Sequence, residues 1–271
     1  FLCIVFFIID GSIQFVLGKN IFLIEAFSEY RVSSLMGTEP KLGSYIFYTA
    51  PIVIIFFDKI FKTNNKFFDS YLILFIGLTF LIIIFSGDRA PLLRYFIFLS
   101  GFIFLSLIQK NFKLVAPCLI SLLLFSSVAL INENVKTRII DLTLKQISKT
   151  EPKYMPYSIN YEEHYKTSFN IIKDHTLFGI GPKNFANYCG IEKYNSSELA
   201  CATSPHNYYV QVFLELGLFG FLFLFGFYMS IIKNLFLSIF HNLRSLLYND
   251  KFITKKVLIN YYLFILLFPI I

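Results

Sequence analysis

Seven apolar runs divide this chain, and they constrain its fold more than any other feature of the sequence. Of all residues 56% are hydrophobic and only 15% are charged, whereas a soluble domain carries about 25% charged residues. A single soluble core could not bury so many apolar side chains. Runs that approach about 18 apolar residues are typical of membrane-spanning helices. The runs occupy residues 1–9, 43–57, 71–85, 92–108, 114–131, 208–232 and 257–271.

We therefore predict an all-α protein, a polytopic membrane helical bundle with one long periplasmic loop that contains short helices. Residues 1–131 would hold about five spans, the first of them truncated, with an outer loop at 10–42. Residues 132–207 would form the periplasmic loop, and residues 208–271 would form two carboxyl-terminal spans, the last truncated. Because both ends of the chain lie inside apolar runs, we expect it to be a fragment of a longer protein.

Lysine-rich short loops predict the orientation of the spans. The loops at 58–70, 109–113 and 233–256 all fall on one side of a seven-span arrangement. The positive-inside rule makes that side cytoplasmic, and loops longer than about 60 residues escape the rule. We interpret the net charge of +7 as an orientation signal and as attraction to anionic membrane lipid or phosphate, and not as a sign of nucleic acid binding.

The long loop shows helical spacing of apolar residues in two places, at 137–149 and at 162–175. We expect two short helices there, close to the membrane surface. Gly179 and Gly181 then interrupt the pattern. Two interpretations of this Gly-Ile-Gly-Pro stretch stay open: a tight turn, or backbone that approaches a sugar or a phosphate.

Two cysteines of the long loop, Cys189 and Cys201, predict a disulfide, because an oxidising periplasm permits one. The alternative is two free thiols. Metal ligation is less favoured, since only His206 lies close by and there is no second pair of cysteines.

The stretch Ser-Gly-Asp-Arg at residues 86–89 places Asp88 and Arg89 between two spans. A charged residue at a membrane edge often only caps a helix or marks topology. Arg89 also suits phosphate binding, since a guanidinium donates two parallel hydrogen bonds. Asp88 could pair with it.

A second polar group surrounds His206, where we expect a helix to start and to run straight into a span. Gln211 and Glu215 share one face of that helix, and a Glu two turns into a span must face the bundle or water. Histidine accepts a proton near neutral pH. The alternative for His206 is a capping or structural role.

Taken together, these elements resemble the O-antigen ligase/polymerase family in order and spacing over nearly the whole chain. The matching positions are Asp10, Gly11, Gln14, Gly18, Lys19, Arg31, residues 43–45 and 86–89, His164, Tyr165, residues 178–185, Cys189, Cys201, residues 205–207, Gln211, Glu215 and Gly217.

The resemblance implies a membrane glycosyltransferase of the bacterial inner membrane whose active site faces the periplasm. Such an enzyme takes a glycan from a polyprenyl diphosphate-linked donor and transfers it to a sugar hydroxyl, typically on lipid A-core or on a growing glycan. His206 resembles the essential histidine, and Arg89 resembles an arginine bound to the donor diphosphate. Arg138, and after it Arg31, are secondary candidates for the diphosphate site. The positions expected to support the site are Asp88, Asn207, Gln211, Glu215, Gly179 and Gly181.

We expect the reaction to invert the anomeric centre and to need no metal and no other cofactor. The outer loops hold no metal-binding pair of acids, and the chain lacks a nucleotide-binding phosphate loop. Alternatives within the family are a polysaccharide polymerase and a protein O-oligosaccharyltransferase. An alternative of another class is a polysaccharide or lipid transporter, which would favour polar residues near mid-bilayer; a structural membrane subunit is a further one.

Overall fold

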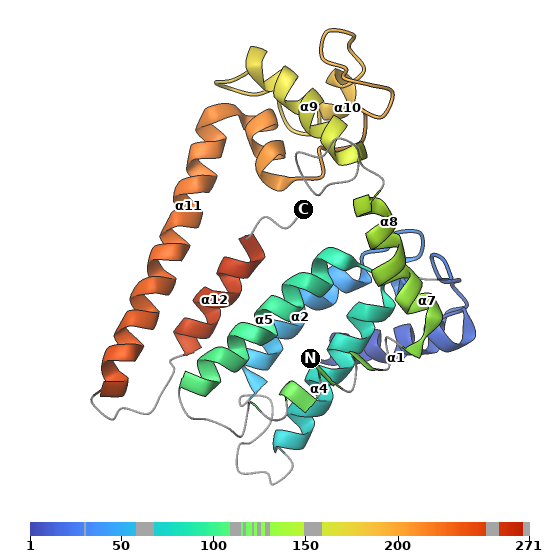
Figure 1. Cartoon of the computed structure of the whole chain (residues 1–271), viewed down its shortest axis with the longest axis vertical. Coiled ribbons are helices and arrows are strands. Elements are labelled where there is room, and N and C mark those ends of the chain that lie inside the picture. Colours follow the sequence, from blue (N-terminus) through green and yellow to red (C-terminus); the bar gives the residue numbers. More distant parts are fainter. Residues whose placement is uncertain are drawn as a thin grey trace. The chain divides into compact units, whose positions relative to one another are not determined.

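The computed structural model describes residues 1–29, 31–57, 68–108, 131–148, 159–247 and 255–267, with isolated positions between 115 and 127. These ranges are predominantly helical and contain no strand beyond two isolated β-bridges, which confirms the all-α prediction. Figure 1 colours the helices in chain order. They are α1 (Leu2–Leu17), η1 (Ser34–Met36), α2 (Leu42–Ile55), α4 (Phe68–Phe85), α5 (Arg89–Ile108), α7 (Glu133–Lys136), η2 (Thr137–Asp141), α8 (Leu142–Ser148), α9 (Ile159–Asp174), α10 (Phe185–Tyr188), α11 (Tyr208–Leu247) and α12 (Lys255–Leu267).

The chain divides into two compact units. The first comprises Phe1–Leu142 and Asn234–Leu266, and the second comprises Thr143–Lys233 together with Leu267–Ile271. We describe each unit by itself and refer to them as the first and the second unit.

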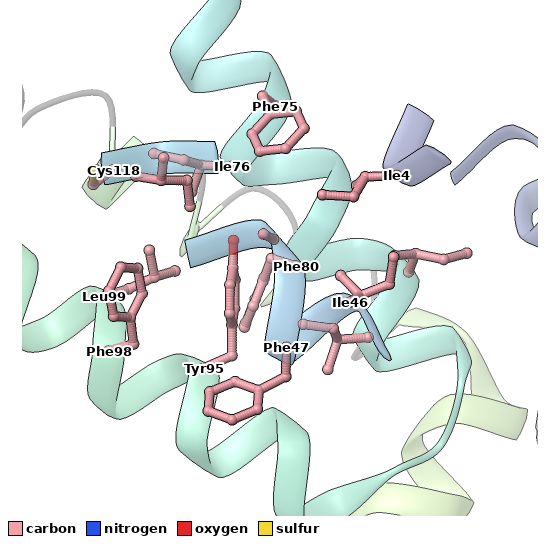
Figure 2. Close-up of a cluster of buried hydrophobic side chains, with 14 of the residues drawn as sticks. Ile4, Ile46, Phe47, Phe75, Ile76, Phe80, Tyr95, Phe98, Leu99 and Cys118 are labelled. Atoms are coloured by element: carbon pink, nitrogen blue, oxygen red, sulfur yellow. The ribbon is translucent and has the colours of Figure 1, made fainter. Parts of the chain in front are cut away.

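The core of the first unit is built where α1, α2, α4 and α5 pack against one another. Figure 2 shows some of its buried side chains, among them Tyr95 and Phe98 from α5 and Phe47 from α2. The Tyr95 hydroxyl does not stay unsatisfied in this apolar core, because it lies 2.6 Å from the hydroxyl of Thr79 on α4. Aromatic packing with satisfied polar tips thus holds these helices together.

Two tyrosines attach α12 to the same unit. The hydroxyl of Tyr261 donates to the carbonyl oxygen of Ile97 at 2.6 Å, and the hydroxyl of Tyr262 donates to that of Tyr48 at 2.7 Å. Both carbonyls belong to helices of the core, α5 and α2. Helix α12 therefore packs on the core of the first unit.

Two helices of the described part are long and apolar enough to cross a membrane, Arg89–Leu107 and Tyr208–Phe240. Three shorter apolar helices are Leu2–Leu17, Leu42–Ile55 and Ser70–Phe85. The predicted span at 114–131 and the lysine-rich loops at 58–70 and 109–113 lie largely outside the described residues. The third expected loop, at 233–256, is helical over most of its length, because α11 continues to Leu247. The seven-span arrangement and its orientation therefore stay predictions.

The first helix is longer than the sequence indicated. An outer loop was expected to begin at residue 10, but α1 continues to Leu17 and includes Asp10 and Gln14. Both side chains are buried, at 0% and 1% exposure, and they bond to the segment that follows the helix. Asp10 and Gln14 do not mark a loop, as their polarity suggested, because their buried side chains bond the following segment to the helix.

The predicted short helices of the long loop are present. Helix α8 follows the π-helical turn η2 over the first expected stretch, and α9 covers most of the second. The second unit places its apolar core between α9, α10 and the start of α11, around Ile171, Phe185 and Leu214. Helix α9 buries Ile171 and Ile172 together with polar residues of the preceding turns, whereas Phe169 is 50% exposed, so its apolar spacing matches the buried face only in part.

Candidate functional site

Three arginines from separate parts of the sequence converge on the turn between α4 and α5. Arg89 begins α5, and its Nη2 donates to the carbonyl oxygen of Arg138 at 3.1 Å. Arg138 donates from Nε to the carbonyl oxygen of Gly87 at 3.3 Å. Arg31 donates from Nε to the carbonyl oxygen of Ser86 at 3.4 Å. The first unit therefore brings together all three arginines that the sequence singled out.

Asp88 supplies a carboxylate to this arginine cluster and forms an ion pair with Arg31. Burial raises the pKa of the Asp88 carboxyl above its usual range, and the charge of Arg31 and the backbone amides of Gly43 and Ser44 oppose that rise. These two amides lie in the first turn of α2, where the helix dipole favours negative charge. The sequence suggested that Asp88 pairs with Arg89, whereas the ion pair is with Arg31.

The segment that carries Arg31 is held by α1. The side-chain carbonyl of Gln14 accepts the backbone amides of Ser33 and Ser34, at 2.9 and 2.6 Å. The buried carboxylate of Asp10 accepts the hydroxyl of Ser34. These bonds fix the backbone directly after Arg31, so polar residues of α1 determine where its guanidinium lies.

Arg138 lies in η2, a π-helical turn between α7 and α8. Turns of π-helix are rare in proteins. Those that occur are frequently found at functional sites. The sequence placed Arg138 in a short helix of the long loop, at 137–149, and the structure has it on a helical segment of the first unit.

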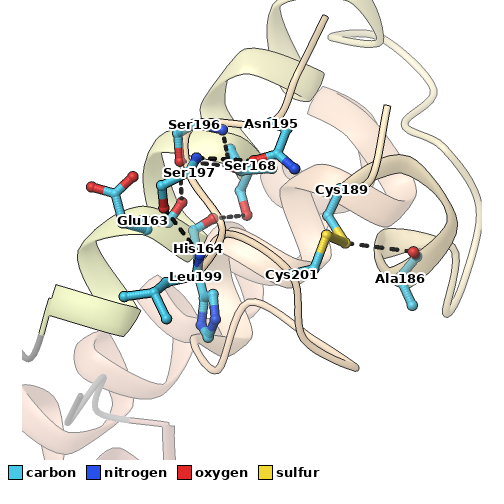
Figure 3. The surroundings of a disulfide bond; sticks show 11 residues. Glu163, His164, Ser168, Ala186, Cys189, Asn195, Ser196, Ser197, Leu199 and Cys201 are labelled. Atoms are coloured by element: carbon cyan, nitrogen blue, oxygen red, sulfur yellow. Dashed lines mark hydrogen bonds between the residues drawn. A yellow bond between two sulfur atoms is a disulfide. The ribbon is translucent and has the colours of Figure 1, made fainter. Parts of the chain in front are cut away.

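The second unit contains a disulfide between Cys189 and Cys201, the pair expected from the sequence, with Cα atoms 5.2 Å apart (Figure 3). The segment that it closes is bound to α9. The hydroxyls of Thr167 and Ser196 lie 2.9 Å apart, and the Ser196 hydroxyl donates to the carbonyl oxygen of Glu163 at 3.2 Å. The disulfide and these bonds together hold residues 189–201 against one side of α9.

His206 lies in the second unit, in a backbone conformation that few side chains adopt. Its φ is 59°, in the left-handed region, where residues other than Gly are uncommon and often mark functional sites. Its imidazole is exposed, and the centroid of its ring lies 5.5 Å from those of Tyr161 and His164 on α9. The first turns of α9 thus flank the candidate base on two sides.

Asn207 caps the helix that begins after it. Its side-chain oxygen accepts the backbone amides of Tyr209 and Val210, at 3.0 and 3.2 Å. Asn is among the best residues for this position. The capping role that remained open for His206 therefore belongs to Asn207.

Gln211 and Glu215 share one face of α11, as predicted. The side-chain amide of Gln211 donates to the carboxylate of Glu215 at 2.9 Å, and both side chains are partly buried. The carboxylate of Glu215 thus receives a hydrogen bond from a side chain of its own helix.

The Gly-Ile-Gly-Pro stretch packs against the backbone of α11. The amide of Ile180 donates to the carbonyl oxygen of Leu214, and the amide of Gly181 donates to that of Glu215, both at 2.9 Å. A Cβ on Gly179 would collide with the backbone of Glu215. Of the two open interpretations, this geometry agrees with the tight turn, because the glycines let the turn pack closely on a helix.

Helix α11 does not run straight, contrary to the prediction. Gly217 interrupts it with φ 66° and ψ −163°, a conformation essentially confined to Gly. The amide of Leu218 turns to the carbonyl oxygen of Thr176 at 2.7 Å, and a Cβ on Gly217 would collide with Leu177. The break frees backbone groups of α11, and residues 176–181 bond to them.

One residue near His206 was not among the predicted site residues. His164 is 6% exposed, and burial followed by the charge of His206 lowers its pKa from the ordinary value. In the sequence it contributed only to the family resemblance, because a lone histidine in an amphipathic helix looks like a core residue. Its closeness to His206, 42 positions later, is visible only in the fold.

In the part of the chain that the structure describes, no three His, Cys, Asp or Glu side chains gather as a metal site would require. The donor atoms near His206 are those of His164 and Tyr161, which do not make such a set.

Comparison with known proteins gives one match. The family model described as O-antigen ligase matches residues 73–225, more than half of the chain. This range includes Arg89, Arg138, His164, the disulfide and His206. No curated protein and no solved structure matches the chain.

Proposed function

Because this chain belongs to the O-antigen ligase family of membrane glycosyltransferases, we propose that it transfers a glycan from a polyprenyl diphosphate carrier to an acceptor sugar hydroxyl. We place this reaction at the periplasmic face of a bacterial inner membrane, with lipid A-core or a growing glycan as the acceptor. Membrane lipid surrounds the protein in this proposal.

The observation that carries the proposal is the arginine cluster of Arg31, Arg89 and Arg138 at one turn. Arg31 forms an ion pair with the carboxylate of Asp88, and the guanidinium groups of Arg89 and Arg138 donate to the backbone carbonyl oxygens of Arg138 and Gly87. Arginine suits a diphosphate, because it presents donors in a planar fork that matches phosphate oxygens. The same charges would stabilise the diphosphate as a leaving group while negative charge develops on it.

His206 supports the second half of the reaction. Its imidazole is exposed and lies in a strained backbone conformation that the cap at Asn207 and the rings of α9 maintain. An exposed histidine can accept a proton near neutral pH. We assign it as the general base that takes the proton of the acceptor hydroxyl.

The proposed step balances without a further reactant. The acceptor oxygen attacks the anomeric carbon and forms the new glycosidic bond, while the bond from that carbon to the diphosphate oxygen breaks with its electron pair. The hydroxyl proton goes to His206, and polyprenyl diphosphate leaves. A single displacement inverts the anomeric centre, and the arginines supply the charge that a metal ion would otherwise provide.

Complementation tests this function. The protein is expressed in cells that lack either the ligase or the polymerase of a lipid-linked glycan. Restored glycan on lipid A-core identifies a ligase, restored chain length identifies a polymerase, and glycan on protein identifies a protein O-oligosaccharyltransferase. Accumulation or movement of carrier without any transfer would support a transporter and contradict the proposal.

The variant His206→Ala should abolish transfer while the protein remains in the membrane at a normal amount. His175→Gln is the matched control, because His175 lies in the same unit and contacts Tyr188 and Tyr194 instead. We expect that control to keep its activity. Full transfer by His206→Ala would show that His206 is not the base.

A further inference from the structure

His164 lies beside His206 in the second unit. His164 lies one turn after Tyr161 on α9, and the rings of His164 and His206 are 5.5 Å apart between centroids with 34° between their planes. The Tyr161 ring lies 6.2 Å from that of His164 and 5.5 Å from that of His206. His206 thus lies near one ring that can become a cation, that of His164, and near the phenol ring of Tyr161.

The surroundings of the two imidazoles differ. His164 is buried beneath its neighbours, with the ring of Phe185 6.5 Å away, whereas His206 is exposed. Burial first, and the charge of His206 second, lower the pKa of His164, and the backbone of Leu199 opposes them. Burial thus disfavours the charged form of the His164 imidazole.

Charged side chains on the elements around the two histidines form pairs with other residues, and the side chain of Glu198 is exposed to solvent. The described pairs are Lys166 with Glu162 and Glu163, Lys193 with Asp174, and Gln211 with Glu215. The charge of His206 acts on the pKa of His164 across the 5.5 Å between the ring centroids.

We propose that His164 is a positioning residue for His206, whose neutral imidazole stabilises the protonated form that His206 adopts when it accepts the proton of the sugar hydroxyl. A neutral imidazole always keeps one nitrogen lone pair, which can face an imidazolium directly or through one water molecule. Two charged imidazoles at this separation would repel each other, which favours a neutral His164 when His206 accepts a proton. This inference rests on the proposed function of His206.

The sign of the pH effect follows from this role. The base is active when neutral, so activity declines as pH falls through the titration of His206. In this proposal a neutral His164 stabilises the protonated form of His206. The pH at which activity is half-lost on the acid side (the midpoint) is therefore higher than it would be without the His164 imidazole. Removing the ring nitrogens of His164 should move the midpoint to lower pH, by roughly 0.5 to 1 unit, and weaken the base, so that the plateau rate falls by up to about tenfold.

The test compares three variants of the full chain in membranes. His164→Phe keeps a ring in the same place without nitrogen and should show the acid-ward shift. His164→Gln restores an acceptor oxygen and should recover part of it. Tyr161→Phe keeps the other ring and should leave the midpoint unchanged. Loss of activity in His164→Phe without any shift of the midpoint would reduce His164 to a packing residue and overturn the inference.

A second measurement does not depend on transfer. The proton NMR or carbon-13 titration of His206 in labelled protein, assigned by the signal lost in His206→Gln, should move to lower pH in His164→Phe. An unchanged titration overturns the role of His164 even if the enzyme is inactive. Retained activity of His206→Ala, in contrast, overturns the function proposed for His206, so the two failures are distinguishable.

Discussion

At the scale of single residues, Gly217 shows most clearly how backbone conformation builds the second unit. A non-glycine residue at φ 66° and ψ −163° costs about 1 to 3 kcal/mol. Its Cβ would also collide with the carbonyl oxygen of Leu177, which is backbone and cannot turn aside. The break that it makes in α11 lets the amide of Leu218 bond to Thr176.

We predict that Gly217→Ala strongly lowers the thermal stability of the second unit and its yield in the membrane. Gly226 of the same helix is the matched control, because a Cβ there meets nothing within 4 Å and its φ is not positive. Gly226→Ala should be neutral or stabilising by about 0.5 to 1 kcal/mol, since Ala favours helices. Equal melting temperatures for the two variants would contradict this account.

Sequence alone singled out candidate site residues, but it did not predict which of them contact one another. It singled out Arg31, Arg89 and Arg138, but it did not show that they share one turn, because that depends on Asp10 and Gln14 holding a distant segment. These two polar residues suggested a loop, since helix burial of polar groups depends on partners elsewhere in the chain.

At the scale of elements, α9 organises the second unit. Its apolar face packs around Ile171, its polar side binds residues 189–201, and its first turns flank His206. Sequence spacing predicted this helix, because apolar positions recur at the helical period. The break in α11 was not predicted, because a Gly within an apolar run is compatible with either a straight or a broken helix.

The disulfide should stabilise this element in particular. Cys189 and Cys201 are separated by 12 positions, and closing a loop of about this size stabilises a fold by about 3 kcal/mol in the chain-entropy model. We expect the double variant Cys189→Ser, Cys201→Ser to lower the melting temperature of the purified protein. Reductant should do the same to the wild type and nothing further to the variant.

The variant Cys118→Ser provides the control for reductant acting on other thiols, because Cys118 is a free cysteine of the first unit. If reductant lowered the melting temperature of the double variant as much as that of the wild type, the stabilising role of the disulfide would be refuted.

At the scale of the whole molecule, the two units supply different chemistry to one proposed reaction. The first holds the arginine cluster, and the second holds His206 with His164. The account therefore predicts that variants of the two groups fail in different ways. A change in the cluster should impair binding of the donor diphosphate, and a change at His206 should impair the transfer step after binding.

The most direct measurement separates these two steps in purified protein with a labelled polyprenyl diphosphate-linked glycan. We predict that Arg89→Lys weakens donor binding by about tenfold, because the charge stays but the fork is lost. His206→Ala should bind the donor as the wild type does and lose about 10²- to 10⁴-fold in single-turnover transfer. Transfer by His206→Ala at the wild-type rate, with donor binding unchanged in Arg89→Lys, would contradict the account.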